Sequence, residues 1–96
     1  MDKIRLQNVS FSYADAEALK DVSLDVPAQQ VTVLFGPAKS GKTTLLRLLN
    51  RLTDLLEGTR RSGTILLDGE DIYAPGVDAA ELRRRVGMVF ALPIPL

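Results

Sequence analysis

The feature that most constrains this chain is a glycine-rich segment at residues 36–43, which reads G-P-A-K-S-G-K-T. It matches the phosphate-binding loop pattern G-x-x-x-x-G-K-[ST] at every fixed position. In such a loop the backbone N–H groups surround phosphate oxygens, and the glycines adopt backbone angles that other residues resist. The helix that follows adds the positive end of its dipole to the site. The segment therefore predicts a site for the phosphates of a nucleoside triphosphate.

Two side chains of this segment have defined roles in the pattern. Lys42 is predicted to reach the β- and γ-phosphates, and the Thr43 hydroxyl is predicted to bind Mg²⁺. The alternative is a glycine-rich turn that caps a helix, with Lys42 merely solvated. The flanking sequence favours the phosphate loop. Residues 31–35 (V-T-V-L-F) are typical of a buried strand, and residues 45–52 place leucines at helical spacing opposite polar side chains.

Composition excludes several classes of protein. A chain of 96 residues suffices for one small domain, and 46% hydrophobic with 25% charged residues is typical of a soluble globular protein. The formal net charge is zero, so nothing indicates a nucleic-acid partner or an anionic membrane surface. The chain has no cysteine, which excludes a disulfide framework. No apolar stretch approaches the roughly 20 residues that span a bilayer. We therefore expect a cytoplasmic chain that is not itself in the membrane.

The rest of the sequence predicts short strands joined by polar segments. Strands are expected over residues 4–9, 19–26, 31–35, 64–67 and 86–90. Loops are expected over residues 14–18 and 54–63. A helix is expected over residues 78–85, with Asp78 as its N-cap and Glu81 at the spacing of a capping box. The arginine run at residues 83–85 is interpreted as a solvated helix face.

Asp68 has the sequence position of an Mg²⁺ ligand, but the residue that follows it indicates a turn. It ends the apolar run at residues 65–67, as does the aspartate that helps to hold Mg²⁺ in phosphate-loop ATPases. Gly69 follows it, however, and an Asp-Gly pair after a strand is typical of a tight hairpin turn. We therefore interpret Asp68 as a turn residue.

Several segments together carry a resemblance to a known family. They are residues 8–13 (N-V-S-F-S-Y), residues 18–24 (A-L-K-D-V-S-L), the phosphate loop, residues 63–73 and residues 82–90. Over nearly the whole chain, the sequence resembles the N-terminal part of an ATP-binding cassette (ABC) transporter ATPase, in particular the ATP-binding subunit of bacterial phosphate importers. The resemblance implies an α/β fold of the P-loop NTPase class. In that fold an antiparallel β-subdomain adjoins the start of a parallel phosphate-loop core.

The resemblance also implies the ligands, ATP and Mg²⁺, and the residues that bind them. Tyr13 would stack on the adenine ring. A flat aromatic side chain suits this role, because stacking does not require hydrogen bonds to the edges of the base. From the residues alone, an ordinary strand position is an equally good interpretation of Tyr13. Thr43 would bind Mg²⁺ and Thr44 would add a phosphate contact. The residues that would surround the phosphates are Gly36, Pro37, Ala38, Lys39, Ser40, Gly41 and Lys42.

The activity implied by the resemblance is ATP hydrolysis that drives solute import. Two cassettes would enclose two nucleotides, and transmembrane permease subunits would be the partners, at the inner face of the plasma membrane. No nucleic-acid partner is expected. Alternatives are a cassette ATPase outside transport, a non-hydrolysing nucleotide-binding remnant and a phosphate-loop kinase. The kinase is the weakest, because the pattern over residues 11–24 has no role there.

Two departures from the family bear on turnover. Ala91 stands where the family has a glutamine that contacts Mg²⁺ and the attacking water. In such proteins the helical subdomain, the signature loop and the acidic Walker B strand lie further along than Leu96. We therefore expect residues 1–96 to form a partial nucleotide-binding domain that binds ATP without hydrolysing it.

Overall fold

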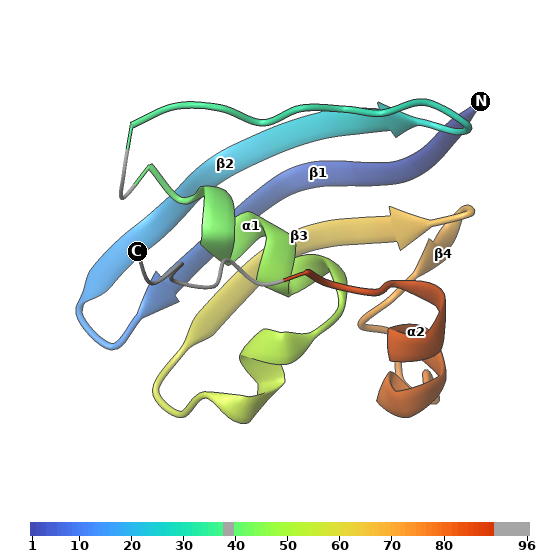
Figure 1. The fold of residues 1–96 in the computed structure, drawn as a ribbon. Helices are drawn as coiled ribbons and strands as arrows, with labels where there is room; N and C mark the ends of the chain where they lie inside the picture. Colours follow the sequence, from blue (N-terminus) through green and yellow to red (C-terminus); the bar gives the residue numbers. More distant parts are fainter. Residues whose placement is uncertain (38–39, 90–96) are drawn as a thin grey trace, which may run out of the picture.

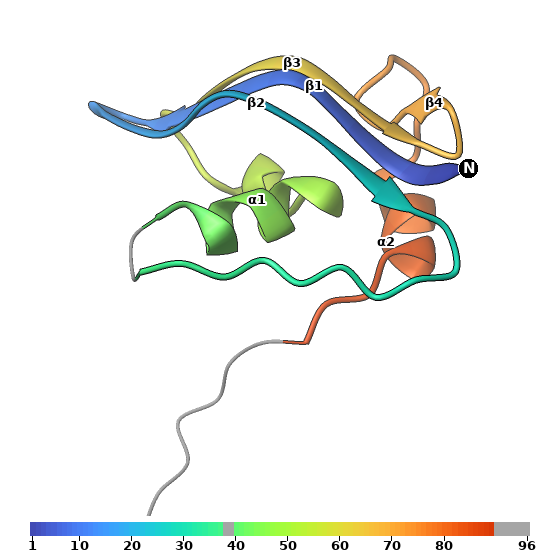
Figure 2. The ribbon, with the colours of Figure 1, turned by 90° about the horizontal axis from the view of Figure 1, so that it is seen from above.

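The computed structural model describes residues 1–37 and 40–89, whose strands form one antiparallel sheet (Figure 1). The strands are β1 (Asp2–Tyr13), β2 (Ala16–Pro27), β3 (Arg60–Leu67) and β4 (Glu70–Asp71), in the spatial order β2-β1-β3-β4. The helices are α1 (Lys42–Leu49), the 3₁₀ helix η1 (Leu52–Leu55) and α2 (Ala79–Arg85). Figure 2 shows that α1 and α2 lie on the same side of the sheet.

The long hairpin of β1 and β2 is held by apolar residues that face each other across the strands. The pairs are Ile4 with Val26, Leu6 with Leu24, Val9 with Val22, and Phe11 with Leu19. Cross-strand apolar pairs of this kind stabilise a sheet and fix its register. They give the sheet one apolar face, which α1 and α2 cover. The buried apolar side chains of this core are Leu6, Val9, Phe11, Leu19, Leu45, Leu48, Ile65, Leu67, Ile72 and Leu82.

A bulge in β1 keeps Leu6 and Val9 on the same face although they are three positions apart. Asn8 adopts a positive φ of 52°, and the pairing of β1 with β3 shifts its register between Gln7 and Ser10. Gly63 of β3 lies against this bulge with a φ of +88°, and a Cβ on it would lie 2.2 Å from the carbonyl oxygen of Asn8. Only glycine therefore fits at position 63.

Two of the predicted loops are shorter than expected. Residues 14–18 were expected to form a loop, but β2 begins at Ala16, so Ala14 and Asp15 alone make the turn. The expected loop over residues 54–63 contains the end of η1 and the start of β3. Both errors have one cause. β1 continues as far as Tyr13, so Ala16 pairs with Tyr13 and Arg60 pairs with Ser12.

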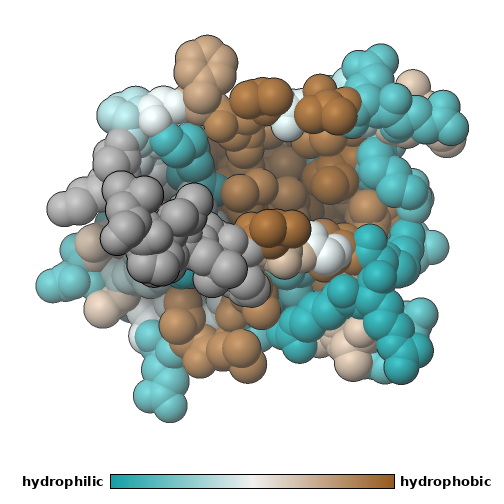
Figure 3. Space-filling view, viewed as in Figure 1, coloured by the Kyte–Doolittle hydropathy of each residue, from teal (hydrophilic) through white to brown (hydrophobic). Residues whose placement is uncertain are grey.

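The strand expected over residues 31–35 is not formed in the described structure. The segment is extended but pairs with no other strand, and Val31, Val33 and Phe35 are 92%, 71% and 89% exposed. A strand needs a neighbour to accept and donate its backbone hydrogen bonds, and residues 1–37 and 40–89 offer this segment none. It runs past α1 on the side away from the sheet (Figure 2), and apolar side chains gather on that face (Figure 3).

The second missing strand is the one expected over residues 86–90. Residues 86–89 form no strand, and Phe90 lies outside the described residues. Within the described part of the chain, no helix is long and apolar enough to cross a membrane.

Candidate nucleotide-binding site

The phosphate-loop segment leads directly into α1, as the pattern predicts. Gly41 is the N-cap of α1, and its carbonyl accepts the first helical hydrogen bond from the N–H of Leu45 at 2.9 Å. The φ of Gly41 is +93°, and a Cβ there would lie 2.8 Å from the carbonyl oxygen of Ala18 in β2. A side chain at position 41 would therefore be strained and would also collide with the sheet.

The N-terminus of α1 has the properties of an anion site. No side chain caps it, and its first turn contains no acidic residue. The first N–H groups of a helix have no partner within the helix, and the helix dipole places partial positive charge there. Ser40 is exposed beside this terminus, and Ala38 and Lys39 lie outside the described residues.

Lys42 folds back over the loop. Its ammonium group donates hydrogen bonds to the carbonyl oxygen of Gly36 and, at 3.2 Å, to the carbonyl oxygen of Pro37. The positive charge is thus held at the loop by two neutral carbonyl acceptors. Phosphate oxygens would replace these carbonyls favourably, because a negative phosphate adds the attraction of opposite charges to the hydrogen bond.

The two threonines after Lys42 differ in their surroundings. Thr43 is exposed, so its hydroxyl is free to bind a ligand. Thr44 is 7% exposed, and its Oγ1 lies 2.8 Å from the hydroxyl oxygen of Tyr13. The structure therefore brings Tyr13, which is distant in sequence, against the first turn of α1. Sequence reasoning missed this contact, because no local pattern links a residue at the end of β1 to one in α1.

A cavity of about 290 Å³ lies between β2 and the start of α1. Its lining is mostly apolar, and Ser23, Ser40 and Lys42 contribute polar side chains. Tyr13 does not line it. The cavity therefore adjoins the phosphate-loop segment without joining it to the predicted base-binding residue.

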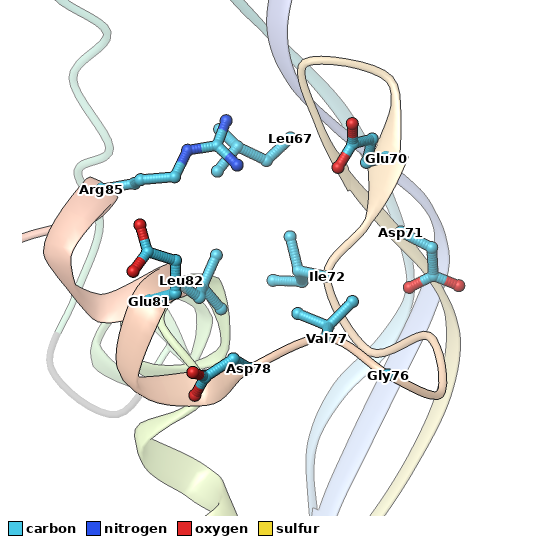
Figure 4. Close-up of a pocket in the computed structure, with 10 residues that line it drawn as sticks. All are labelled: Leu67, Glu70, Asp71, Ile72, Gly76, Val77, Asp78, Glu81, Leu82 and Arg85. Atoms are coloured by element: carbon cyan, nitrogen blue, oxygen red, sulfur yellow. The ribbon is translucent and has the colours of Figure 1, made fainter.

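A second cavity, of about 270 Å³, lies between β4 and α2 (Figure 4). Ile72, Val77 and Leu82 converge on its floor, and Arg85 extends over one edge (Figure 4). Its charged lining residues are Glu70, Asp71, Asp78, Glu81 and Arg85. Four carboxylates against one guanidinium disfavour a polyphosphate by charge repulsion. None of the predicted site residues lines this cavity.

Asp68 is a turn residue, as predicted. Asp68 and Gly69 both have positive φ, 51° and 81°, which is the geometry of a type I′ hairpin turn between β3 and β4. Its carboxylate accepts hydrogen bonds from Lys3 at 3.0 Å and from Arg85 at 2.8 Å. The hydrogen bond from Lys3 lowers the pKa of Asp68, and the nearby charges of Lys3 and Arg85 lower it further.

The arginine run at residues 83–85, at the end of α2, was expected to form a solvated helix face, and the structure differs from this at one position. Arg84 is exposed and faces Glu81 at 3.6 Å, as expected of a solvated helix face. Arg83 is different, because its guanidinium donates to the backbone carbonyls of Asn50 and Arg51 at 3.2 and 2.9 Å. The prediction of a solvated face is therefore wrong for Arg83, which contacts the end of the helix that carries the site. A basic run alone does not show which of its members turns inward.

Comparison with known proteins gives matches over most of the chain. The model of a family described as ABC transporter matches residues 19–94. The phosphate import ATP-binding protein PstB of Salinibacter ruber (strain DSM 13855 / M31) is 50% identical over 93 residues, which cover 97% of this chain and 37% of that protein. The protein of the same name from Parasynechococcus marenigrum (strain WH8102) is 51% identical over 92 residues, covering 96% and 34%. The chain thus spans about a third of the length of these relatives.

Proposed function

The chain belongs to the ABC transporter family, and we propose that it is the part of an importer ATPase that binds MgATP. Two relatives at about 50% identity are named phosphate import ATP-binding proteins, which supports phosphate as the solute. In this proposal ATP binding and hydrolysis drive import. The partners are a second cassette and transmembrane permease subunits, at the cytoplasmic face of the membrane.

The observation that carries the proposal is the donor set at the start of α1. The uncapped N–H groups of the first turn, the ammonium group of Lys42 and the exposed hydroxyl of Thr43 are all donors or positive charges. No carboxylate lies in that first turn. Such a set suits a polyanion. The Thr43 hydroxyl is also a suitable ligand for a metal cation that accompanies the polyanion. The chemistry of the residues present therefore fits the phosphates of MgATP.

Each residue has a defined part in the proposed complex. The loop residues Gly36 to Lys42 would hold the phosphates, with Lys42 exchanging the carbonyls of Gly36 and Pro37 for phosphate oxygens. Thr43 would be the protein ligand to Mg²⁺, which, when bound, neutralises charge on the phosphates. Tyr13 would hold the adenine through its ring face. The contact predicted between Thr44 and a phosphate stays a prediction, since the observed partner of Thr44 is Tyr13.

The proposal is tested by equilibrium titration of the full chain with a fluorescent ATP analogue, in buffer with and without Mg²⁺. We expect saturable binding that unlabelled ATP displaces fully and that inorganic triphosphate displaces at a higher concentration, because it lacks the base. Binding should be tighter with Mg²⁺. Failure of unlabelled ATP to displace the analogue, with circular dichroism showing a folded chain, would contradict the proposal.

A further inference from the structure

Tyr13 and Thr44 form a hydroxyl pair that joins the end of β1 to the first turn of α1. The two oxygens are 2.8 Å apart, and Thr44 is buried in the contact. Thr44 immediately follows Thr43, the predicted Mg²⁺ ligand, while Tyr13 is the predicted base-binding residue. The pair therefore connects the two halves of the proposed site through a single hydrogen bond.

The position of the Tyr13 ring is set by two contacts at different points on the side chain. The ring lies edge-to-face with Phe11, with centroids 5.1 Å apart and planes at 85°. Its hydroxyl is held by Thr44. A tyrosine side chain has two rotatable bonds, so a contact at the ring and another at the hydroxyl leave it little freedom. A ring fixed before its ligand arrives loses less entropy on binding.

We propose that Thr44 is a positioning residue, which holds Tyr13 in the orientation that stacks on the base. The inference rests on the proposed function and assigns Thr44 a role through Tyr13 rather than through a phosphate. The inference predicts different effects on the binding of two kinds of ligand. Removing the Thr44 hydroxyl must weaken binding of a ligand that carries a base and must spare a ligand that has phosphates only.

The variants follow from the geometry. Thr44→Val keeps the branched shape in its buried site and removes only the hydroxyl, whereas Thr44→Ser keeps the hydroxyl. Tyr13→Phe removes the other half of the pair and keeps the ring. Thr53→Val is the matched control, because Thr53 is a second buried threonine, 4% exposed, in η1 and outside the proposed site.

The experiment measures the Kd of each full-length variant for MgATP and for inorganic triphosphate. We expect Thr44→Val and Tyr13→Phe each to raise the Kd for ATP by about three- to tenfold, the range for one hydrogen bond, with triphosphate unchanged. The double variant should be no worse than either single one, because both remove the same bond. Thr44→Ser and Thr53→Val should bind ATP like the parent chain.

The outcomes separate this inference from the proposed function. Equal losses for ATP and triphosphate in Thr44→Val, with Tyr13→Phe unaffected, would show a direct phosphate contact and overturn the inference. So would an equal loss in Thr53→Val, which would mean that the effect is only structural. If the parent chain binds neither ligand, the proposed function itself fails.

Discussion

Arg83 in α2 contacts the C-terminal end of α1, because its guanidinium donates to the backbone carbonyl of Asn50, the C-cap of that helix, at 3.2 Å. The last carbonyls of a helix have no partner within it, so an outside donor is needed there. Arg83 also donates to the carbonyl of Arg51, the residue after this C-cap, at 2.9 Å. The hydroxyl of Tyr73 donates to the carbonyl of Leu48 at 2.8 Å. The helix that carries the phosphate loop is therefore held at both ends, by Tyr13 at its start and by Arg83 and Tyr73 at its end.

Replacing Arg83 should destabilise the fold. We expect Arg83→Ala to lower the free energy of unfolding by about 1.5–3 kcal/mol, because two backbone carbonyls lose a charged donor. Arg83→Lys should recover only part of this, since an ammonium group cannot reproduce the planar fork of a guanidinium. Urea unfolding measures the effect. Arg84→Ala is the control and should change stability by less than about 0.5 kcal/mol. Equal losses in the two alanine variants would show that the bonds of Arg83 contribute nothing.

Gly63 should be intolerant of any side chain. Gly63→Ala combines a left-handed backbone angle with a collision at 2.2 Å against the Asn8 carbonyl. We expect it to cost about 3 kcal/mol or more, or to prevent folding. Gly58→Ala is the matched control, since Gly58 also has a positive φ, +72°, but a Cβ there meets nothing within 4 Å. That variant should lose only about 1–2 kcal/mol. If thermal melting ranked the two variants alike, the bulge would not be the constraint.

Asp68 should make stability depend on pH in the acid range. Its pKa is lower in the folded chain than in the unfolded chain, chiefly because of the hydrogen bond from Lys3. Its stabilising effect is therefore fully present above the unfolded pKa of about 3.9 and is lost as the pH falls through the folded value. Asp68→Asn, which tolerates the same positive φ, should flatten the decline of stability below about pH 4.

The control for this pH effect is Asp15→Asn, in the turn between β1 and β2. It removes one carboxylate without removing either partner of Asp68, so it separates the effect of the Asp68 ion pairs from the general loss of one negative charge. Urea midpoints between pH 7 and pH 2.5 are the measurement. An unchanged acid slope in Asp68→Asn would contradict the assigned ion pairs.

Local signals in the sequence predicted the features that depend on neighbouring residues. The helix after the phosphate loop, the Asp68-Gly69 turn and the Asp78 N-cap are confirmed, with the Asp78 carboxylate accepting from the N–H of Ala80 at 2.9 Å. The resemblance to the ABC family is also confirmed by the match over residues 19–94. The helix, the turn and the N-cap each depend on a short pattern whose physical meaning does not require the rest of the fold.

Features that depend on distant partners could not be predicted in the same way. The strand expected over residues 31–35 needs neighbours that the described residues do not supply. The Tyr13–Thr44 bond and the inward turn of Arg83 join elements far apart in sequence. For the site, the sequence therefore identified the phosphate-binding segment but not the contacts that hold it in place.

The central claim is that the segment ending at Lys42 binds the phosphates of ATP, and the most direct test removes one positive charge at a time from α1. Lys42→Ala should raise the Kd for MgATP about ten- to a hundredfold, because a charge-assisted phosphate contact contributes about 1.5–3 kcal/mol. Arg47→Ala removes a charge from the last turn of the same helix and should leave the Kd within about twofold. A Kd that rises equally in both variants, or in neither, would contradict the claim.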